Sequence, residues 1–111
     1  MNKVFITGAS GGIGSAIADK FKKHNHKLIL TSSSDKNLRN LKKEYGDDHF
    51  YYLLNFNERE LFDKNLKKIS DEHKDISVII NNAGITDDSL ILRMKNTQWD
   101  EVIKANLTSN F

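Results

Sequence analysis

Four of the six glycines fall within seven residues, directly after a short apolar run at residues 4–6. They are Gly8, Gly11, Gly12 and Gly14. Glycine concentrates where the backbone must turn sharply or let another group come close. The apolar residues that follow, Ile13, Ile17 and Phe21, recur at helical spacing. A buried strand, a glycine turn and the start of a helix are therefore predicted here.

Such a strand, turn and helix together form an anion-binding site. The first N–H groups of the helix lack partners, and they face the same point as the positive end of its dipole. A dinucleotide pyrophosphate is the usual ligand of this arrangement. We assign the tight turn to Gly8, the close approach of the ligand to Gly12, and the packing of the helix on the strand to Gly14.

Strand and helix patterns alternate along the rest of the chain. Apolar runs predict strands at residues 28–30, 50–54 and 78–80, and helical spacing predicts helices over 38–45 and 58–73, with a further helical pattern at 99–107. Asp35 is expected to cap the second helix, and Gly46 to end it. This order predicts an α/β fold: a Rossmann-type, doubly wound parallel sheet of about four strands with crossover helices.

Composition narrows the classes of function. The 111 residues contain 17 basic and 15 acidic side chains in mixed runs, so no basic stripe indicates a nucleic-acid partner. No cysteine is present, which excludes disulfides and thiolate catalysis. No apolar stretch reaches the roughly 20 residues that span a bilayer, and the four histidines show no metal-ligand spacing. We expect a cytoplasmic protein without a membrane or metal partner.

A second motif, Asn81-Asn82-Ala83-Gly84, follows the fourth predicted strand. In a doubly wound sheet the ligand lies at the carboxyl ends of the strands, where the strand order reverses. The first and fourth strands are expected on either side of that point, so both motifs would face one crevice. The alternative is an ordinary asparagine-rich turn.

Together the motifs T-G-x-x-x-G-x-G and N-N-A-G resemble those of the short-chain dehydrogenase/reductase family. The resemblance runs from Val4 to the end of the chain and covers less than half of a family member. Within the family it is closest to the bacterial 3-oxoacyl-[acyl-carrier-protein] reductases. The residues that carry this closer match are Asn82-Ala83-Gly84-Ile85-Thr86, Asp88, Arg93-Met94-Lys95 and Trp99.

The resemblance implies roles for individual residues. The residues implied in cofactor binding are Gly8, Ala9, Ser10, Gly11, Gly12, Ile13, Gly14, Ser32, Ser33, Asn55, Phe56, Asn82, Ala83 and Gly84. Residues 8–11 would line the pyrophosphate and adenosine ribose, residues 55–56 would flank the adenine, and Asn82 would touch the ribose beside the nicotinamide. Asn106 matches the active-site asparagine that holds a water in the proton relay. Its alternative role is to cap or kink a helix.

The end of the second strand bears on the choice of cofactor. An NAD enzyme needs a carboxylate there for the ribose 2′-hydroxyl. This chain has Thr31, Ser32 and Ser33 instead, with no carboxylate before Asp35. NADPH is therefore expected over NADH, with Lys36 or Arg39 as candidate partners of the 2′-phosphate.

Family chemistry also requires a tyrosine acid, a lysine four residues later and a serine that polarises the carbonyl. None of the three tyrosines, Tyr45, Tyr51 and Tyr52, has a lysine at that position. We expect residues 1–111 to be the N-terminal part of a single dinucleotide-binding domain, inactive alone because the catalytic C-terminal part is absent. The intact enzyme is expected to form a homo-oligomer, commonly a tetramer in this family.

The leading hypothesis is NADPH-dependent reduction of a 3-oxoacyl group on acyl carrier protein to the 3-hydroxyacyl form, in fatty-acid synthesis. A second hypothesis keeps the family but assigns another alcohol or ketone substrate. A third is a nucleotide-binding fragment without catalysis.

Overall fold

A computed structural model describes residues 3–83, which form one parallel sheet with helices on both faces. The strands are β1 (Lys3–Thr7), β2 (Lys27–Ser32), β3 (Phe50–Leu53) and β4 (Ile76–Asn81). The helices between them are α1 (Gly12–Lys23), α2 (Asp35–Tyr45) and α3 (Arg59–Glu72). The strand order is β3-β2-β1-β4, and all three pairings are parallel.

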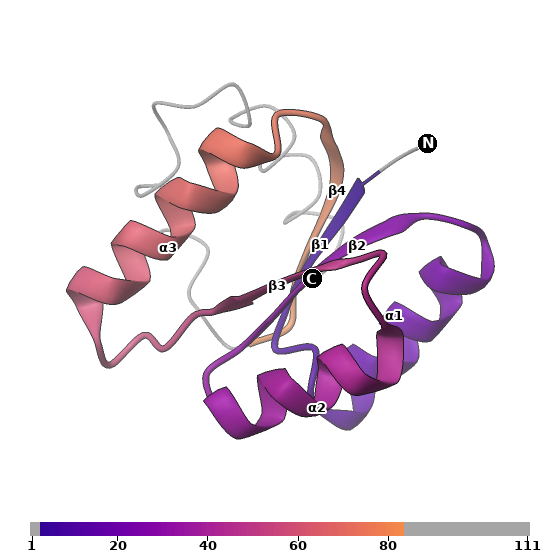
Figure 1. The fold of residues 1–111 in the computed structure, drawn as a ribbon, viewed down its shortest axis with the longest axis horizontal. Coiled ribbons are helices and arrows are strands. Elements are labelled where there is room, and N and C mark those ends of the chain that lie inside the picture. The colour runs from indigo at the N-terminus through magenta and orange to yellow at the C-terminus, as the bar shows by residue number, and fades with distance from the viewer. Residues whose placement is uncertain (1–2, 84–111) are drawn as a thin grey trace.

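The sheet separates two layers of helix. Helices α1 and α2 cover one face, and α3 covers the other (Figure 1). Neighbouring residues of the central strands alternate between these layers: Val4 packs in the cluster with Leu41, whereas Phe5 packs in the cluster with Phe62 and Leu66. Both faces of the two central strands are thus buried, which explains their uninterrupted apolar sequences.

The chain order places a switch point between β1 and β4. From β1 the chain proceeds outward through β2 to β3, and then α3 leads across to β4 on the other side of β1. The loops that follow β1 and β4 therefore lie side by side at the carboxyl ends of the strands. This arrangement confirms the predicted α/β class and the predicted position of the first and fourth strands.

All seven elements predicted before residue 84 are present, with different boundaries. Parallel pairing extends β1, β2 and β4 beyond their apolar runs, because backbone hydrogen bonds continue into polar residues such as Thr7 and Asn81. Gly46 ends α2 with a φ of 89°, as predicted. The helical pattern at 99–107 lies outside the described residues.

The predicted cap of α2 was wrong. Ser34 is the N-cap, and its hydroxyl accepts a hydrogen bond from the Asn37 N–H at 3.3 Å. Asp35 is the first residue of the helix, where its carboxylate faces Arg39 one turn later at 3.5 Å. Serine can cap here because residue 34 has extended backbone angles, which an N-cap requires. Between residues 3 and 83 no helix is long and apolar enough to cross a membrane.

Candidate dinucleotide site

Thr7, the last residue of β1, joins the two sequence motifs. Its hydroxyl donates to Asn81 Oδ1 at 2.9 Å and accepts from the N–H groups of Asn82 at 2.9 Å and Ala83 at 3.2 Å. A hydroxyl has one donor and two acceptor positions, so all of them are used. The side chain is fully buried. Thr7 was not among the predicted site residues, although its place before the first glycine was a usable signal.

Gly8 and Gly14 hold the turn and the helix together. Gly8 has a φ of 64°, which confirms its predicted tight turn, and its carbonyl accepts from the Asn82 side-chain amide at 3.2 Å. A Cβ added to Gly14 would lie 2.3 Å from the Gly8 oxygen and 3.0 Å from the Ala9 Cα. The close packing that requires glycine at position 14 is therefore against the turn after β1, not against the strand itself.

Gly11 and Gly12 differ from these two because the protein leaves open space beside them. A Cβ on Gly11 would meet only the Gly8 oxygen, at 3.7 Å, and one on Gly12 would meet nothing within 4 Å. Gly11 also has ordinary extended angles, with a φ of −77°. Neither packing nor backbone strain in residues 3–83 requires glycine here. Space for a ligand against the backbone does explain it, so these residues fit a dinucleotide.

The start of α1 supplies hydrogen-bond donors to that space. Gly11 is the N-cap and has no side chain to accept from the helix. The N–H groups of Gly12, Ile13 and Gly14 lie in the first turn, where no helical carbonyl precedes them. These donors and the positive end of the helix dipole suit a phosphate group.

A cavity of about 480 Å³ lies beside Gly11, the N-cap of α1, at the carboxyl ends of the strands. Its volume is in the usual range for small-molecule sites. It is lined by Gly8, Ser10, Gly11, Thr31, Ser33, Leu54, Asn55, Phe56, Asn57, Asn82 and Ala83. It thus joins the glycine turn, the ends of β2 and β3, and the asparagine motif, which are separated by up to 75 positions in the sequence.

Most of the predicted binding residues line this cavity. Those that do are Gly8, Ser10, Gly11, Ser33, Asn55, Phe56, Asn82 and Ala83. Leu54 and Asn57 also line it without having been predicted, and so does Thr31, which was named only in connection with the choice of cofactor. Each of these three is next to a predicted residue at a strand end, so the same strand-end argument would have found them. Gly84 and Asn106 lie outside the described residues.

Five predicted residues lie behind or beside the cavity instead. Ala9 is fully buried, and its N–H is bonded to the Thr31 carbonyl at 3.0 Å. Ser32 is 3% exposed, with its hydroxyl 3.2 Å from that of Ser10 and accepting from the Ser34 N–H. Ile13 is 71% exposed and is not a lining residue. Gly12 and Gly14 do not line the cavity either. Ala9, Ser32 and Gly14 shape the wall from behind.

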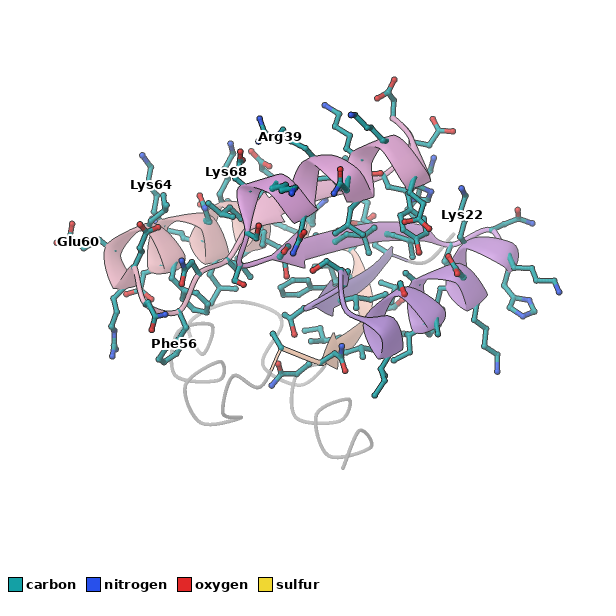
Figure 2. The ribbon with its side chains drawn as sticks, turned by 90° about the horizontal axis from the view of Figure 1, so that it is seen from below. Lys22, Arg39, Phe56, Glu60, Lys64 and Lys68 are labelled. Atoms are coloured by element: carbon teal, nitrogen blue, oxygen red, sulfur yellow. The ribbon has the colours of Figure 1, made fainter. Side chains whose placement is uncertain are left out.

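The loop after β3 forms the outer end of the cavity. The Asn55 side chain accepts from the Asn57 N–H at 3.0 Å, which holds the turn closed. Phe56 is 38% exposed, and its ring packs edge-to-face on Phe62 with centroids 5.5 Å apart. In Figure 2, Phe56 lies below α3. A held aromatic ring at this end suits a flat heterocycle.

The lining side chains carry no formal charge. Lys36 and Arg39 were the predicted partners of a 2′-phosphate, yet neither lines the cavity. Arg39 faces Asp35, and both side chains are about two-thirds exposed, at 71% and 68%. Attraction for an anion in this cavity therefore comes from backbone N–H groups and the helix dipole.

None of the three tyrosines is prepared for proton transfer near neutral pH. Burial, followed by the charge of Asp47, raises the pKa of Tyr51 to about 12. Burial and hydrogen bonds to Asp19 and Glu72 raise the pKa values of Tyr45 and Tyr52 further. All three lie outside the cavity lining. No group of three metal-ligating side chains occurs within residues 3–83 either.

Comparison with known proteins agrees with this geometry. Residues 2–111 match the short chain dehydrogenase family. The chain belongs to this family. It is therefore related to oxidoreductases, and the fold and the two motifs are those expected of a member.

Two curated relatives are both described as 3-oxoacyl-[acyl-carrier-protein] reductases. The chain is 38% identical over 107 residues to the 3-oxoacyl-[acyl-carrier-protein] reductase FabG of Buchnera aphidicola, covering 96% of this chain and 44% of the relative. It is 39% identical over 106 residues to the corresponding reductase of Vibrio cholerae, covering 96% and 43%. The chain thus spans less than half the length of these relatives.

A solved structure provides a ligand-bound comparison. The methylglyoxal/isovaleraldehyde reductase Gre2 of yeast, complexed with NADPH, aligns with a TM-score of 0.59 at 26% identity. The alignment covers 71% of this chain and 26% of the yeast chain.

Proposed function

We propose that this chain is the dinucleotide-binding part of a cytoplasmic, NADPH-dependent reductase that converts 3-oxoacyl-[acyl-carrier-protein] to the 3-hydroxyacyl form in fatty-acid synthesis. The observation that carries the proposal is the open helix N-terminus above a cavity at the switch point. The descriptions of the two curated relatives support the substrate class. Acyl carrier protein and further copies of the same chain are the proposed partners.

Each part of the cavity has a proposed task. The N–H groups at the start of α1 bind the pyrophosphate, and Phe56 and Asn55 hold the adenine. Asn82, whose side chain is fixed on the Gly8 carbonyl, contacts the ribose near the nicotinamide. NADPH, when bound, supplies the hydride. No tyrosine in these 111 residues has a lysine four positions later, so the proposal assigns the catalytic tyrosine and lysine to another part of the intact enzyme.

Preference for NADPH over NADH rests on the end of β2. Thr31 and Ser33 line the cavity there, and no lining residue is a carboxylate that would repel a 2′-phosphate. Asp35 does not line the cavity and is paired with Arg39. The NADPH complex of the yeast reductase supports the same choice.

Binding is tested by titrating the chain with NADPH and NADH and following cofactor fluorescence. Gly11→Leu fills the open space beside the turn, so the phosphate could no longer approach the backbone N–H groups. We expect this variant to bind NADPH about tenfold more weakly, or weaker still, because charge-assisted hydrogen bonds are lost. Ala16→Leu adds a similar side chain at an exposed position of α1 and serves as the matched control. Equal effects of the two variants, or tighter binding of NADH, would contradict the proposal.

The substrate is tested separately in the intact reductase. We expect NADPH oxidation with a 3-oxoacyl thioester of acyl carrier protein, and slower oxidation with small ketones or aldehydes. Preference for a small ketone would favour another substrate within the family. Cofactor binding without oxidation of any substrate would favour a non-catalytic nucleotide-binding protein.

A further inference from the structure

A second hollow lies at the opposite end of the sheet, beside the amino ends of the strands. Its volume is about 430 Å³, and it is formed where α1 ends and where β2 and β3 begin. It is lined by Lys22, Asn25, His26, Lys27, Asp48 and His49. Figure 2 shows Lys22 and Phe56 on opposite sides of the molecule, so this hollow is separate from the dinucleotide cavity.

Two lysines bring positive charge to the hollow without a carboxylate partner. Neither Lys22 nor Lys27 forms an ion pair with another of the residues 3–83. The Lys22 ammonium lies 5.3 Å from the centre of the Tyr45 ring. Asp48 lines the same hollow but is not within ion-pair distance of either lysine.

His49 adds a directed donor. Its Nδ1 accepts from the Leu28 N–H at 3.0 Å, so Nε2 is the nitrogen that carries the hydrogen when the ring is neutral. Partial burial and then the charges of Lys22 and Lys27 lower the pKa of His49. The positive charges of both lysines therefore lie close enough to the His49 ring to disfavour its protonation. The Nδ1 of His26, also in the lining, is buried without a partner within the described structure.

The negative charges nearby are limited. The carbonyls at the end of α1 already accept hydrogen bonds: that of Phe21 from His24 and His26, and that of Lys22 from Asn25. These bonds reduce the partial negative charge at the C-terminus of α1, and with it the electrostatic attraction of this helix end for the two lysine ammonium groups. Asp48 is the one carboxylate in the lining, so a net positive charge is left for a ligand.

We propose that this hollow binds a small phosphate-bearing molecule, with Lys22, Lys27 and His49 Nε2–H as the donors to its phosphate. Two ammonium groups, from α1 and β2, and one N–H, from the residue before β3, can surround a tetrahedral dianion. Charge-assisted bonds of this kind are strong. The volume exceeds that of a phosphate ion, leaving room for an organic part. The site is independent of the proposed reductase activity.

The test uses inorganic phosphate and the ring resonances of the four histidines, recorded by NMR with chloride at matched ionic strength as the reference. His49 and His26 are expected to shift with a saturable dependence on phosphate. His73, which contacts Lys3 and Tyr52 elsewhere on the sheet, is the internal control and is expected to stay unchanged. Phosphate bound only at the start of α1 would leave the His49 ring unmoved, which would overturn the proposal.

Variants separate a site from general electrostatic attraction. Replacing both Lys22 and Lys27 by methionine is expected to weaken phosphate binding by about tenfold or more, because two charge-assisted bonds are lost. Replacing Lys20 and Lys23 by methionine removes the same charge from α1 outside the lining and is expected to change little. Lys27→Arg keeps the charge and is expected to retain binding. Equal losses in the two double variants, or no saturable shift at His49, would overturn the proposal.

Discussion

At the scale of the residue, the Thr7 hydroxyl is the link between the glycine turn and the asparagine motif. Thr7→Val keeps the shape but removes the acceptor of two backbone N–H groups. A fully buried polar group left unsatisfied costs about 1–3 kcal/mol. Because these two bonds are only partly buried, we expect a total loss of stability in that range, together with weaker NADPH binding. Thr31→Val is the control, because Thr31 makes a single, longer bond of 3.4 Å to the Ile6 carbonyl. Urea unfolding in which Thr31→Val costs more would contradict this role.

The glycines of the turn are predicted to respond differently to alanine. Gly14→Ala places a Cβ 2.3 Å from the Gly8 oxygen, and overpacking of this kind costs about 1–3 kcal/mol. Gly12→Ala meets nothing within 4 Å, and alanine is favoured over glycine in a helix by up to about 1 kcal/mol. We therefore expect urea unfolding to show a less stable Gly14→Ala and an equally or more stable Gly12→Ala. Similar stabilities for the two variants would contradict the packing described here.

At the scale of the element, two neighbouring residues at the start of α2 have different roles. Ser34 is the N-cap, and Asp35 carries a negative charge in the first turn. Ser34→Ala removes the acceptor of the Asn37 N–H and is expected to destabilise the protein by about 1 kcal/mol. Asp35→Ala removes an exposed pair with Arg39 and a favourable dipole contact, worth about 0.3–1 kcal/mol at an exposed site. Chemical denaturation of both variants measures which of them loses more stability. A larger cost at Asp35 would restore our original assignment of the cap.

At the scale of the whole molecule, His73 connects three elements at the amino ends of the strands. The ring contacts the Lys3 ammonium of β1 through Nδ1 at 3.1 Å and the Tyr52 hydroxyl of β3 through Nε2 at 2.7 Å. The Tyr52 hydroxyl in turn donates to Glu72 at 2.5 Å, and Asp75 pairs with Lys3. Because an ammonium donates to Nδ1, the ring is held neutral with its hydrogen on Nε2.

This network makes stability depend on pH. Burial and then the charge of Lys3 lower the pKa of His73 below its usual 6.5, against the opposing carboxylates of Glu72 and Asp75. Below pH 6.5 the unfolded chain therefore binds more protons than the folded one, and stability is expected to fall as the pH drops from about 6.5 towards the lower folded pKa. The lowered pKa of His49 acts in the same direction.

Urea midpoints measured between pH 7.5 and 5.5 test this dependence. His73→Gln is expected to flatten the curve, since glutamine does not titrate. His24→Gln changes an exposed histidine at the end of α1 and is the matched control, with a curve expected to follow that of the unmodified chain. A curve that is flat for the unmodified protein, or equally steep after His73→Gln, would contradict the assignment.

The sequence by itself determined the class of fold and the position of the binding motifs. Apolar runs, helical spacing between them and clustered glycines are local properties of the sequence. The environments of residues such as Phe5, Ile17 and Gly8 could therefore be predicted without knowing which residues they contact. What only the tertiary structure decided depends on segments that are distant in the chain. The Thr7 hydroxyl meets residues 81–83 because β1 and β4 pair. Likewise, Ser32 turns into the wall while Ser33 faces the cavity, a difference set by the pairing of β2 with its neighbours and not by residue type.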